Sequence, residues 1–128
     1  MSDGAAEPTR HDALDGAGPD ALLAAVLAAM QRGADEGAAL LYGALTARAR
    51  GPLGGEAGLR RALDNALLAP LVGAVRVAVE PWDRRDGAAR TTVAVEGPNG
   101  SARYLVSARL GSDGWRFTGV RRDDLPPV

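Results

Sequence analysis

The sequence predicts an α+β fold in which helices come first and an antiparallel sheet follows. Apolar residues recur at helical spacing between residues 19 and 70, and apolar and polar residues alternate between residues 75 and 120. Compact turn sequences, such as the Gly-Pro-Asn-Gly at 97–100, separate the alternating runs. Successive hairpins of this kind form a meander of four strands, so we expect the helices to cover one face of a four-stranded antiparallel sheet.

The first two helices are expected to form a hairpin. Pro19 and Asp20 are typical of the first turn of a helix. Backbone N–H groups in the first turn have no partner within the helix, so proline, which has no N–H, loses no hydrogen bond there. An acidic side chain is attracted to the positive N-terminal end of the helix. The apolar residues of this helix are Leu22, Leu23, Val26, Leu27 and Met30. Asp35 is expected to cap the second helix, which ends near Arg50 because a glycine and a proline follow. The apolar residues of the second helix are Leu40, Leu41 and Leu45.

A short third helix is predicted at about residues 56–68, and Pro70 ends it. One stripe of this helix is apolar and consists of Leu59, Leu63 and Leu67. A second stripe is polar and consists of Arg60, Arg61 and Asp64. The segment therefore has one face for a core and one for solvent.

The strands have two predicted faces, because side chains alternate along a strand. The segment 81–87 is expected to turn the chain between the first two strands. Parity assigns one set of residues to the core side: Val75, Val77, Val79, Thr91, Val93, Val95, Ala102, Tyr104, Val106, Ala108, Leu110, Trp115, Phe117 and Gly119. It assigns the charged residues to the outward side: Arg76, Glu80, Arg90, Glu96, Arg103, Arg109 and Arg116.

Length and composition limit the organisation and the function classes. We expect a flexible leader at 1–18, one domain at 19–121 and an irregular tail at 122–128. The formal charge of the 128-residue chain is -1, so there is no overall field to hold nucleic acid or an anionic membrane. Without cysteine there is no disulfide, thiolate metal site or cysteine nucleophile, and a single histidine excludes a nitrogen-rich metal site. No cofactor is expected.

A cytoplasmic location is expected. The first 18 residues lack the basic stretch and apolar run of a secretory signal. The apolar run at 21–30 is too short for a membrane span, which takes roughly 20 residues.

Three segments carry a resemblance to a known fold family. They are the Arg50-Gly51-Pro52-Leu53 turn that ends the stretch 43–53, the Leu68-Ala69-Pro70-Leu71 segment, and the hairpin from Gly100-Ser101-Ala102-Arg103-Tyr104 to Asp113-Gly114-Trp115-Arg116-Phe117. Over about residues 20–121 the chain resembles the nuclear transport factor 2-like superfamily, and within it a family of uncharacterised bacterial and plant domains. The resemblance implies a cone, with the N-terminal helices on the concave face of a curved sheet, and a homodimer through the outer sheet face. It leaves activity open, since such cones include enzymes, carriers and non-catalytic dimer modules.

The candidate catalytic residue is Asp64, because enzymes of this fold commonly use an inward Asp or Glu as base. A solvated or capping role for Asp64 is the favoured alternative. His11 is not expected to be catalytic, because it lies in the leader without convergent partners.

Aromatic residues are the candidates for binding a small apolar ligand: Tyr42, Trp82, Tyr104 and Trp115. Packing in the core is the competing interpretation for Tyr104 and Trp115. The outward arginines could bind a phosphate chain or an acidic partner, but no aromatic residue lies among them for base stacking. A solvated face or a dimer contact is therefore favoured over nucleic acid.

Two functional hypotheses follow. The first is a small non-catalytic module that dimerises and holds a small apolar ligand in its cone. The alternative is an isomerase or cyclase that acts on a hydrophobic small molecule, with Asp64 as base and Tyr42 or Tyr104 as hydrogen-bond donor. The two differ in whether a carboxylate lies inside the cavity.

Overall fold

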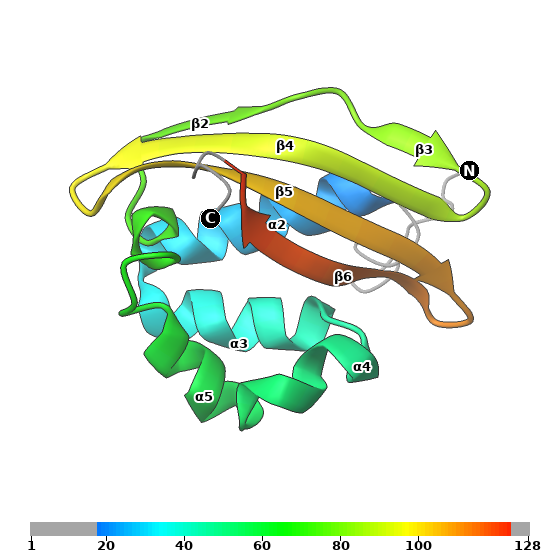
Figure 1. Ribbon diagram of the computed structural model, residues 1–128, viewed down its shortest axis with the longest axis horizontal. Coiled ribbons are helices and arrows are strands. Elements are labelled where there is room, and N and C mark those ends of the chain that lie inside the picture. Colours follow the sequence, from blue (N-terminus) through cyan, green and yellow to red (C-terminus); the bar gives the residue numbers. More distant parts are fainter. Residues whose placement is uncertain (1–17, 124–128) are drawn as a thin grey trace, which may run out of the picture.

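The structure, a computed structural model, describes residues 18–123 and confirms the α+β class. The helices precede the sheet and lie on one side of it (Figure 1). The four α-helices are α2 (Pro19–Arg32), α3 (Ala34–Ala44), α4 (Ala47–Arg50) and α5 (Gly55–Ala62), with single 3₁₀ turns at Gly51–Leu53 and Ala69–Leu71. The strands are β2 (Arg76–Val79), β3 (Asp83–Arg85), β4 (Ala88–Gly97), β5 (Gly100–Gly111) and β6 (Gly114–Arg122). They form one antiparallel, unclosed sheet.

The helices α2 and α3 form the predicted hairpin, but its cap differs from the prediction. The N-cap position of α3 is occupied by Gly33, and no side chain caps the helix there. Asp35 lies inside the first turn instead. Asp35 still favours the positive end of α3 from that position. The two helices pack closely, since a Cβ on Gly37 would lie 2.5 Å from the sulfur of Met30.

The predicted continuous second helix is wrong, because the chain leaves helical geometry at Leu45. This residue is extended, with φ -84° and ψ 152°, and forms a parallel bridge to Phe117 of β6. The backbone N–H of Thr46 donates to the carbonyl of Phe117 over 3.0 Å. The Thr46 hydroxyl then accepts from the N–H of Ala49 over 3.1 Å and starts α4. A contact with the last strand therefore breaks the helix.

The third helix is shorter than predicted, because α5 ends at Ala62 and turns follow. The Asn65 side chain accepts the N–H of Leu67 over 2.8 Å, a local bond that competes with helix formation. Leu59 and Leu63 are buried, but Leu67 leaves their stripe and is 49% exposed.

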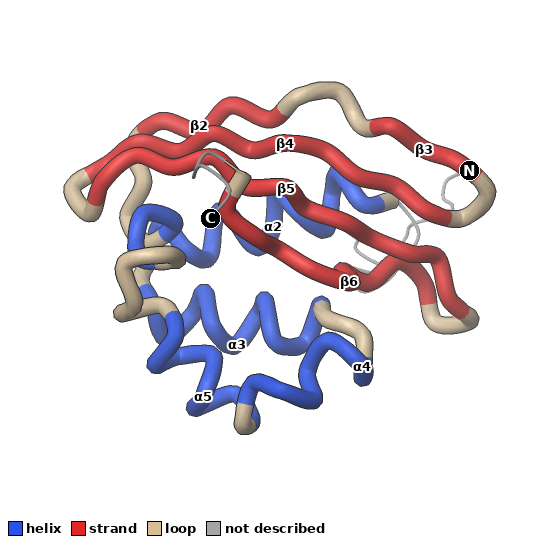
Figure 2. The backbone as a smooth tube through the Cα atoms, in the orientation of Figure 1, coloured by secondary structure: helices blue, strands red, loops and turns tan. Residues whose placement is uncertain are grey.

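The sheet has five strands rather than the predicted four. Its order is β2-β4-β5-β6, and β3 pairs with β4 beyond the end of β2 (Figure 2). The segment predicted as one turn is therefore a gap in an edge strand, followed by a strand and a tight hairpin. Pro81 in the gap has no N–H for the ladder. The hairpin turns at Asp86 and Gly87, which have φ values of 47° and 78° as in a type I′ turn.

In β6, the side chains that point to the core switch from one set of alternate positions to the other along the strand. Ser107 pairs with Gly119 and Ala108 pairs with Phe117, so Thr118 is an extra residue in β6. Such a bulge shifts the parity of the residues beyond it. The predicted inward position of Gly119 is wrong, and Val120, opposite Val106, points to the core instead.

The core lies between α2, α3 and the inner face of the sheet. The predicted inward residues of β4 and β5 are buried between Thr91 and Ala108. Leu110 lies beyond the helices and is 51% exposed, and Val75 precedes β2 and is 75% exposed. The other face of the sheet carries no helix (Figure 1).

Candidate functional site

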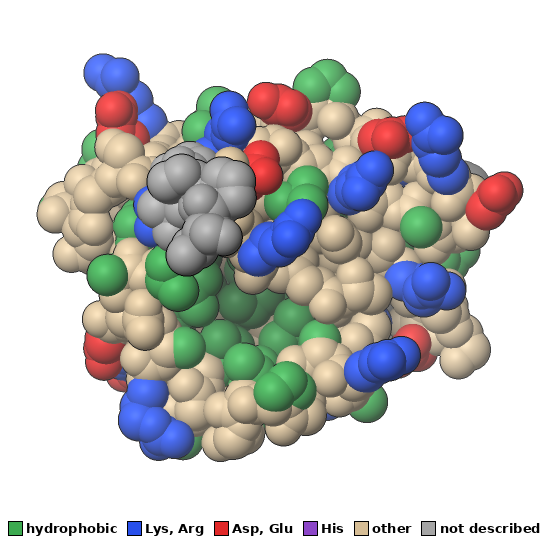
Figure 3. Space-filling model, in the orientation of Figure 1, with side chains coloured by type: hydrophobic (Ala, Val, Ile, Leu, Met, Phe, Trp, Pro, Cys, Tyr) green, Lys and Arg blue, Asp and Glu red, His purple; other side chains and the backbone are tan. Residues whose placement is uncertain are grey.

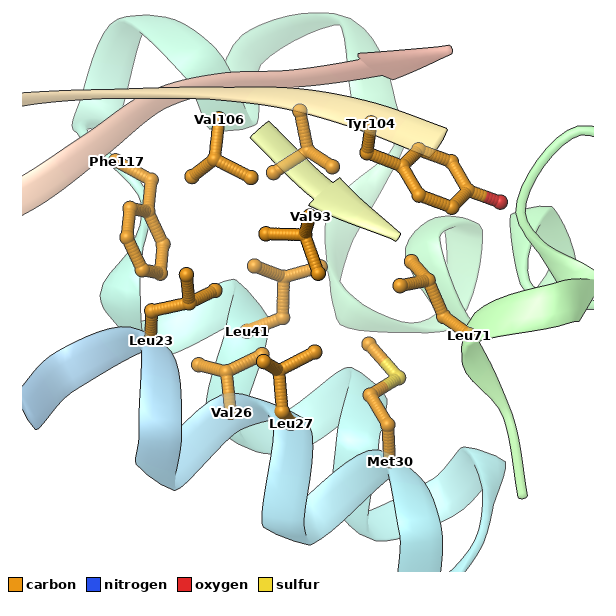
Figure 4. Close-up of a pocket in the computed structure, with 11 residues that line it drawn as sticks. Leu23, Val26, Leu27, Met30, Leu41, Leu71, Val93, Tyr104, Val106 and Phe117 are labelled. Atoms are coloured by element: carbon orange, nitrogen blue, oxygen red, sulfur yellow. The ribbon is translucent and has the colours of Figure 1, made fainter. Parts of the chain in front are cut away.

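The interior contains one small apolar cavity between α2, α3 and the sheet (Figure 4). Its volume is about 20 Å³, which is room for about one water molecule. Its walls are apolar apart from the Tyr104 hydroxyl, which points away from the centre, and consist of Leu23, Val26, Leu27, Met30, Leu41, Leu71, Val93, Tyr104, Val106, Phe117 and Val120. Side chains therefore fill the space between the helices and the sheet almost completely.

No carboxylate lines this cavity. Thr91 is buried, and its hydroxyl donates to the Glu80 carbonyl over 2.6 Å. The Tyr104 hydroxyl donates to the backbone carbonyl of Leu67. Both hydroxyls are thus committed to the backbone, and the cavity holds no acid or base for proton transfer.

Asp64 lies on the surface, away from this cavity. Its side chain is 71% exposed, and its carboxylate lies 3.0 Å from Nη1 of Arg60. Arg60 also contacts Asp35 of α3 over 2.6 Å. The hydrogen bonds that the Arg60 guanidinium donates to Asp35 and Asp64 raise its pKa, so these three residues form an ion-pair cluster between α3 and α5.

The four candidate aromatic residues do not meet in one pocket. Tyr104 is fully buried and lines the core cavity. Tyr42 of α3 lies under Arg50, whose Cζ is 5.1 Å from the ring centroid. Trp115 lies under Arg84, whose Cζ is 5.9 Å from the centroid of the indole ring. Trp82 is in a separate groove.

The groove that holds Trp82 runs between α2 and the β2 edge of the sheet. It has a volume of about 540 Å³ and is mainly apolar, with walls that include Leu23, Leu27, Val77 and Val79. The indole N–H of Trp82 is buried, and it is the one such side-chain atom in the described chain without a hydrogen-bond partner. Asp20 and Glu80 also line this groove.

The outer face of the sheet gathers the predicted arginines. Register places Arg76 opposite Glu96, Arg103 opposite Ala94, and Arg109 opposite Arg116. Three of these arginines have acidic partners: Arg76 with Glu96 at 3.2 Å, Arg116 with Asp113 at 3.4 Å, and Arg103 with Asp123 at 3.7 Å. Figure 3 shows blue side chains over the sheet with a few red acids between them.

A hollow of about 520 Å³ occupies one end of this outer face. We call it the arginine basin, and its charged and hydroxyl residues are Asp83, Arg85, Arg90, Ser107, Arg109 and Thr118. Asp83 is paired with Arg85 at 3.2 Å. Arg90 and Arg109 lie on adjacent strands and form no ion pair with any residue in 18–123, and the same holds for Arg121 on β6.

The sequence predicted part of this basin. Arg90 and Arg109 follow from strand parity, because Ala and Val mark the buried positions between them. Arg85 and Asp83 were missed because their segment looks like a turn. Arg121, which lies on β6 outside the basin, was missed because the bulge at Thr118 changes the parity. Residues 83–85 are all charged and exposed, so no alternation of apolar and polar residues marks β3.

The described residues offer no metal site and no membrane span. No three His, Asp or Glu side chains between residues 18 and 123 lie close enough together to hold a metal ion. In the same range, no helix is both long and apolar enough to cross a bilayer. His11 lies outside the described residues.

Comparison with known proteins gives no family for this chain. No family model matches it, and no curated protein or solved structure matches it significantly.

Proposed function

We propose that this chain is a non-catalytic binding module whose arginine basin takes an acidic segment of a polypeptide. The observation that carries the proposal is the pair Arg90 and Arg109, which line one hollow and have no ion-pair partner among residues 18–123. Guanidinium groups present several donors in a plane that matches a carboxylate. The hydroxyls of Ser107 and Thr118 lie in the same hollow and add neutral hydrogen-bonding groups.

The interior supports the non-catalytic part of the proposal. The cavity has space for about one water molecule, and Asp64 faces solvent and Arg60. An isomerase or cyclase with Asp64 as its base needs that carboxylate beside the bound substrate. The resemblance to the nuclear transport factor 2-like superfamily stays a proposal as well, and helices packed on one face of an antiparallel sheet support it.

An acidic partner suits this face better than a second copy of the chain. In a face-to-face dimer, two sets of unpaired arginines would share one interface, and like charges brought together in this way cost several kcal/mol. Three acids of this face, Asp83, Glu96 and Asp113, are already paired with arginines. A homodimer through this face is thus the second outcome that the experiment below distinguishes.

An acidic polypeptide also suits the face better than nucleic acid. Proteins that bind single strands combine cationic grooves with aromatic rings on which bases stack. The aromatic side chains of β5 and β6 lie on the inner face of the sheet and contribute to the core: they are Tyr104, Trp115 and Phe117. The basin itself is lined by Ala, Ser, Thr, Asp and Arg side chains.

The test measures binding of a fluorescein-labelled oligoglutamate to the full chain by fluorescence anisotropy. We expect the double variant Arg90→Glu and Arg109→Glu to weaken binding about tenfold or more, because two exposed ion pairs are lost. The matched control is Arg48→Glu with Arg61→Glu. These residues are exposed on α4 and α5, lack ion pairs within the described chain, and change the net charge equally.

Three results would contradict the proposal. Equal losses in the two double variants would mean that only net charge matters. Tighter binding of a single-stranded oligonucleotide than of oligoglutamate would assign the face to nucleic acid. The full chain could also sediment as a dimer that the Arg90→Glu variant dissociates. That result would assign the outer face of the sheet to contact with a second copy of the chain.

A further inference from the structure

Charge is divided unevenly along this chain. Residues 18–123 contain fourteen arginines and eleven acids, a formal charge of +3. The leader segment, residues 1–17, has a formal charge of -3 from one basic and four acidic residues: Arg10, Asp3, Glu7, Asp12 and Asp15. The chain thus contains an acidic segment of the kind that the arginine basin is proposed to bind.

The leader joins the domain beside the strand that borders the basin. Gly18 precedes α2, and a Cβ placed on it would lie 3.1 Å from the guanidinium of Arg84 in β3. Asp20 in the first turn of α2 contacts the same guanidinium over 3.3 Å. Arg84 points inward, and its neighbours Asp83 and Arg85 belong to the basin on the outer face. One edge strand therefore separates Gly18 from the basin.

The leader is long enough to pass around this edge. Seventeen extended residues span up to about 56 Å. A domain of this size has a radius of gyration of roughly 13 Å. Asp12 and Asp15 are the acids nearest Gly18 in sequence, so a leader that passed around this edge would bring them to the basin before the acids closer to Met1.

We propose that the leader segment 1–17 occupies the arginine basin of its own chain and competes with an external acidic partner. This inference rests on the proposed function of the basin, and it identifies the occupant of the basin in the free protein. The leader then acts as a built-in competitor, which a stronger or more acidic partner displaces.

The expected strength of this contact is low enough for such exchange. A tethered segment has an effective concentration in the millimolar range. Exposed ion pairs in water contribute little individually and weaken with added salt. The contact therefore holds the leader in place at low ionic strength and releases it in the presence of a competing acidic chain.

The first experiment neutralises the leader in the full chain by Asp3→Asn, Glu7→Gln, Asp12→Asn and Asp15→Asn. We expect this variant to bind labelled oligoglutamate roughly threefold or more tightly than the unmodified chain, because the competitor at millimolar effective concentration is removed. The gain should vanish at high salt, where charges are screened within about 3 Å. An unchanged affinity at low salt would overturn the inference.

The second experiment locates the leader directly. The chain has no cysteine, so Ala13→Cys provides a single attachment point for a nitroxide spin label. We expect loss of NMR amide signal intensity at residues 89–90 and 107–109, and recovery of that signal when Arg90→Glu and Arg109→Glu are added. A label at Ala39→Cys, on the exposed side of α3, is the control that leaves these signals unchanged.

The two proposals fail separately. Oligoglutamate binding at the basin without broadening from the labelled leader overturns the leader contact and leaves the proposed function intact. Broadening at the basin without oligoglutamate binding, even in the neutralised variant, overturns the proposed function. Broadening that is spread evenly over both faces of the domain also overturns the leader contact.

Discussion

The hydroxyl of Tyr104 in β5 donates a hydrogen bond to the backbone carbonyl of Leu67, in the turns that follow α5. Tyr104 is fully buried, and Arg122 of β6 donates to the same carbonyl over 3.4 Å. The guanidinium of Arg122 also lies 5.8 Å from the centre of the Tyr104 ring. These two side chains attach the irregular segment between α5 and the sheet to the strands.

Replacing Tyr104 by Phe tests this attachment. We expect the free energy of unfolding to fall by about 1 kcal/mol, because one buried hydrogen bond is lost while Arg122 still bonds the carbonyl. Urea denaturation measures the change. Tyr42→Phe is the control, since the Tyr42 ring lies under Arg50 and the same change there should leave stability nearly unaltered.

Gly37→Ala tests the close approach of α2 and α3. A Cβ at this position would lie 2.5 Å from the Met30 sulfur and 3.1 Å from the Met30 Cα. We expect a loss of about 1–3 kcal/mol from overpacking, measured by urea denaturation. Gly43→Ala in the same helix has no atom within 4 Å of the new Cβ, and it should stabilise the protein by up to about 0.5 kcal/mol. Equal effects at both positions would contradict the close contact.

Thr46→Ala tests the helix break after Leu45. The Thr46 hydroxyl accepts the N–H of Ala49 over 3.1 Å, and losing this cap should cost about 1 kcal/mol in thermal or urea unfolding. Thr46→Ser keeps the hydroxyl and should restore most of the stability. If Ser and Ala behave alike, the cap is not what stabilises the start of α4.

Gly87→Ala tests the hairpin between β3 and β4. Gly87 has φ 78°, where a side chain costs about 1–2 kcal/mol. We expect that loss in urea denaturation, together with faster amide exchange in β3. Gly119→Ala is the matched change in an extended strand with open space around the new Cβ, and it should be neutral or stabilising.

Local patterns predicted most of this fold, whereas contacts between distant segments explain the misses. Alternation in β4 and β5 correctly separated Val93 and Tyr104 from Arg90 and Arg103, because a strand between a core and solvent repeats every two residues. The helix break at Leu45 depends on Phe117, a partner that no local window contains. The parity change at Thr118 likewise depends on pairing with β5.

The candidate site shows the same limit. Parity predicted that Arg90 and Arg109 face outward, but whether an acid neutralises them depends on the three-dimensional arrangement of other side chains. Asp64 shows the converse, because its sequence position allowed an inward orientation and its ion pair with Arg60 places it on the surface.

The bridge between Leu45 and Phe117 has a consequence for how the chain folds. It joins the end of the second helix to the last strand, so the helical half completes its final contact only when β6 is in place. Contacts between residues far apart in sequence close long loops, and such loop closure slows folding. We therefore expect that a chain emerging from the ribosome makes its α2–α3 hairpin early, and that this hairpin acquires its native end only when synthesis has passed residue 117.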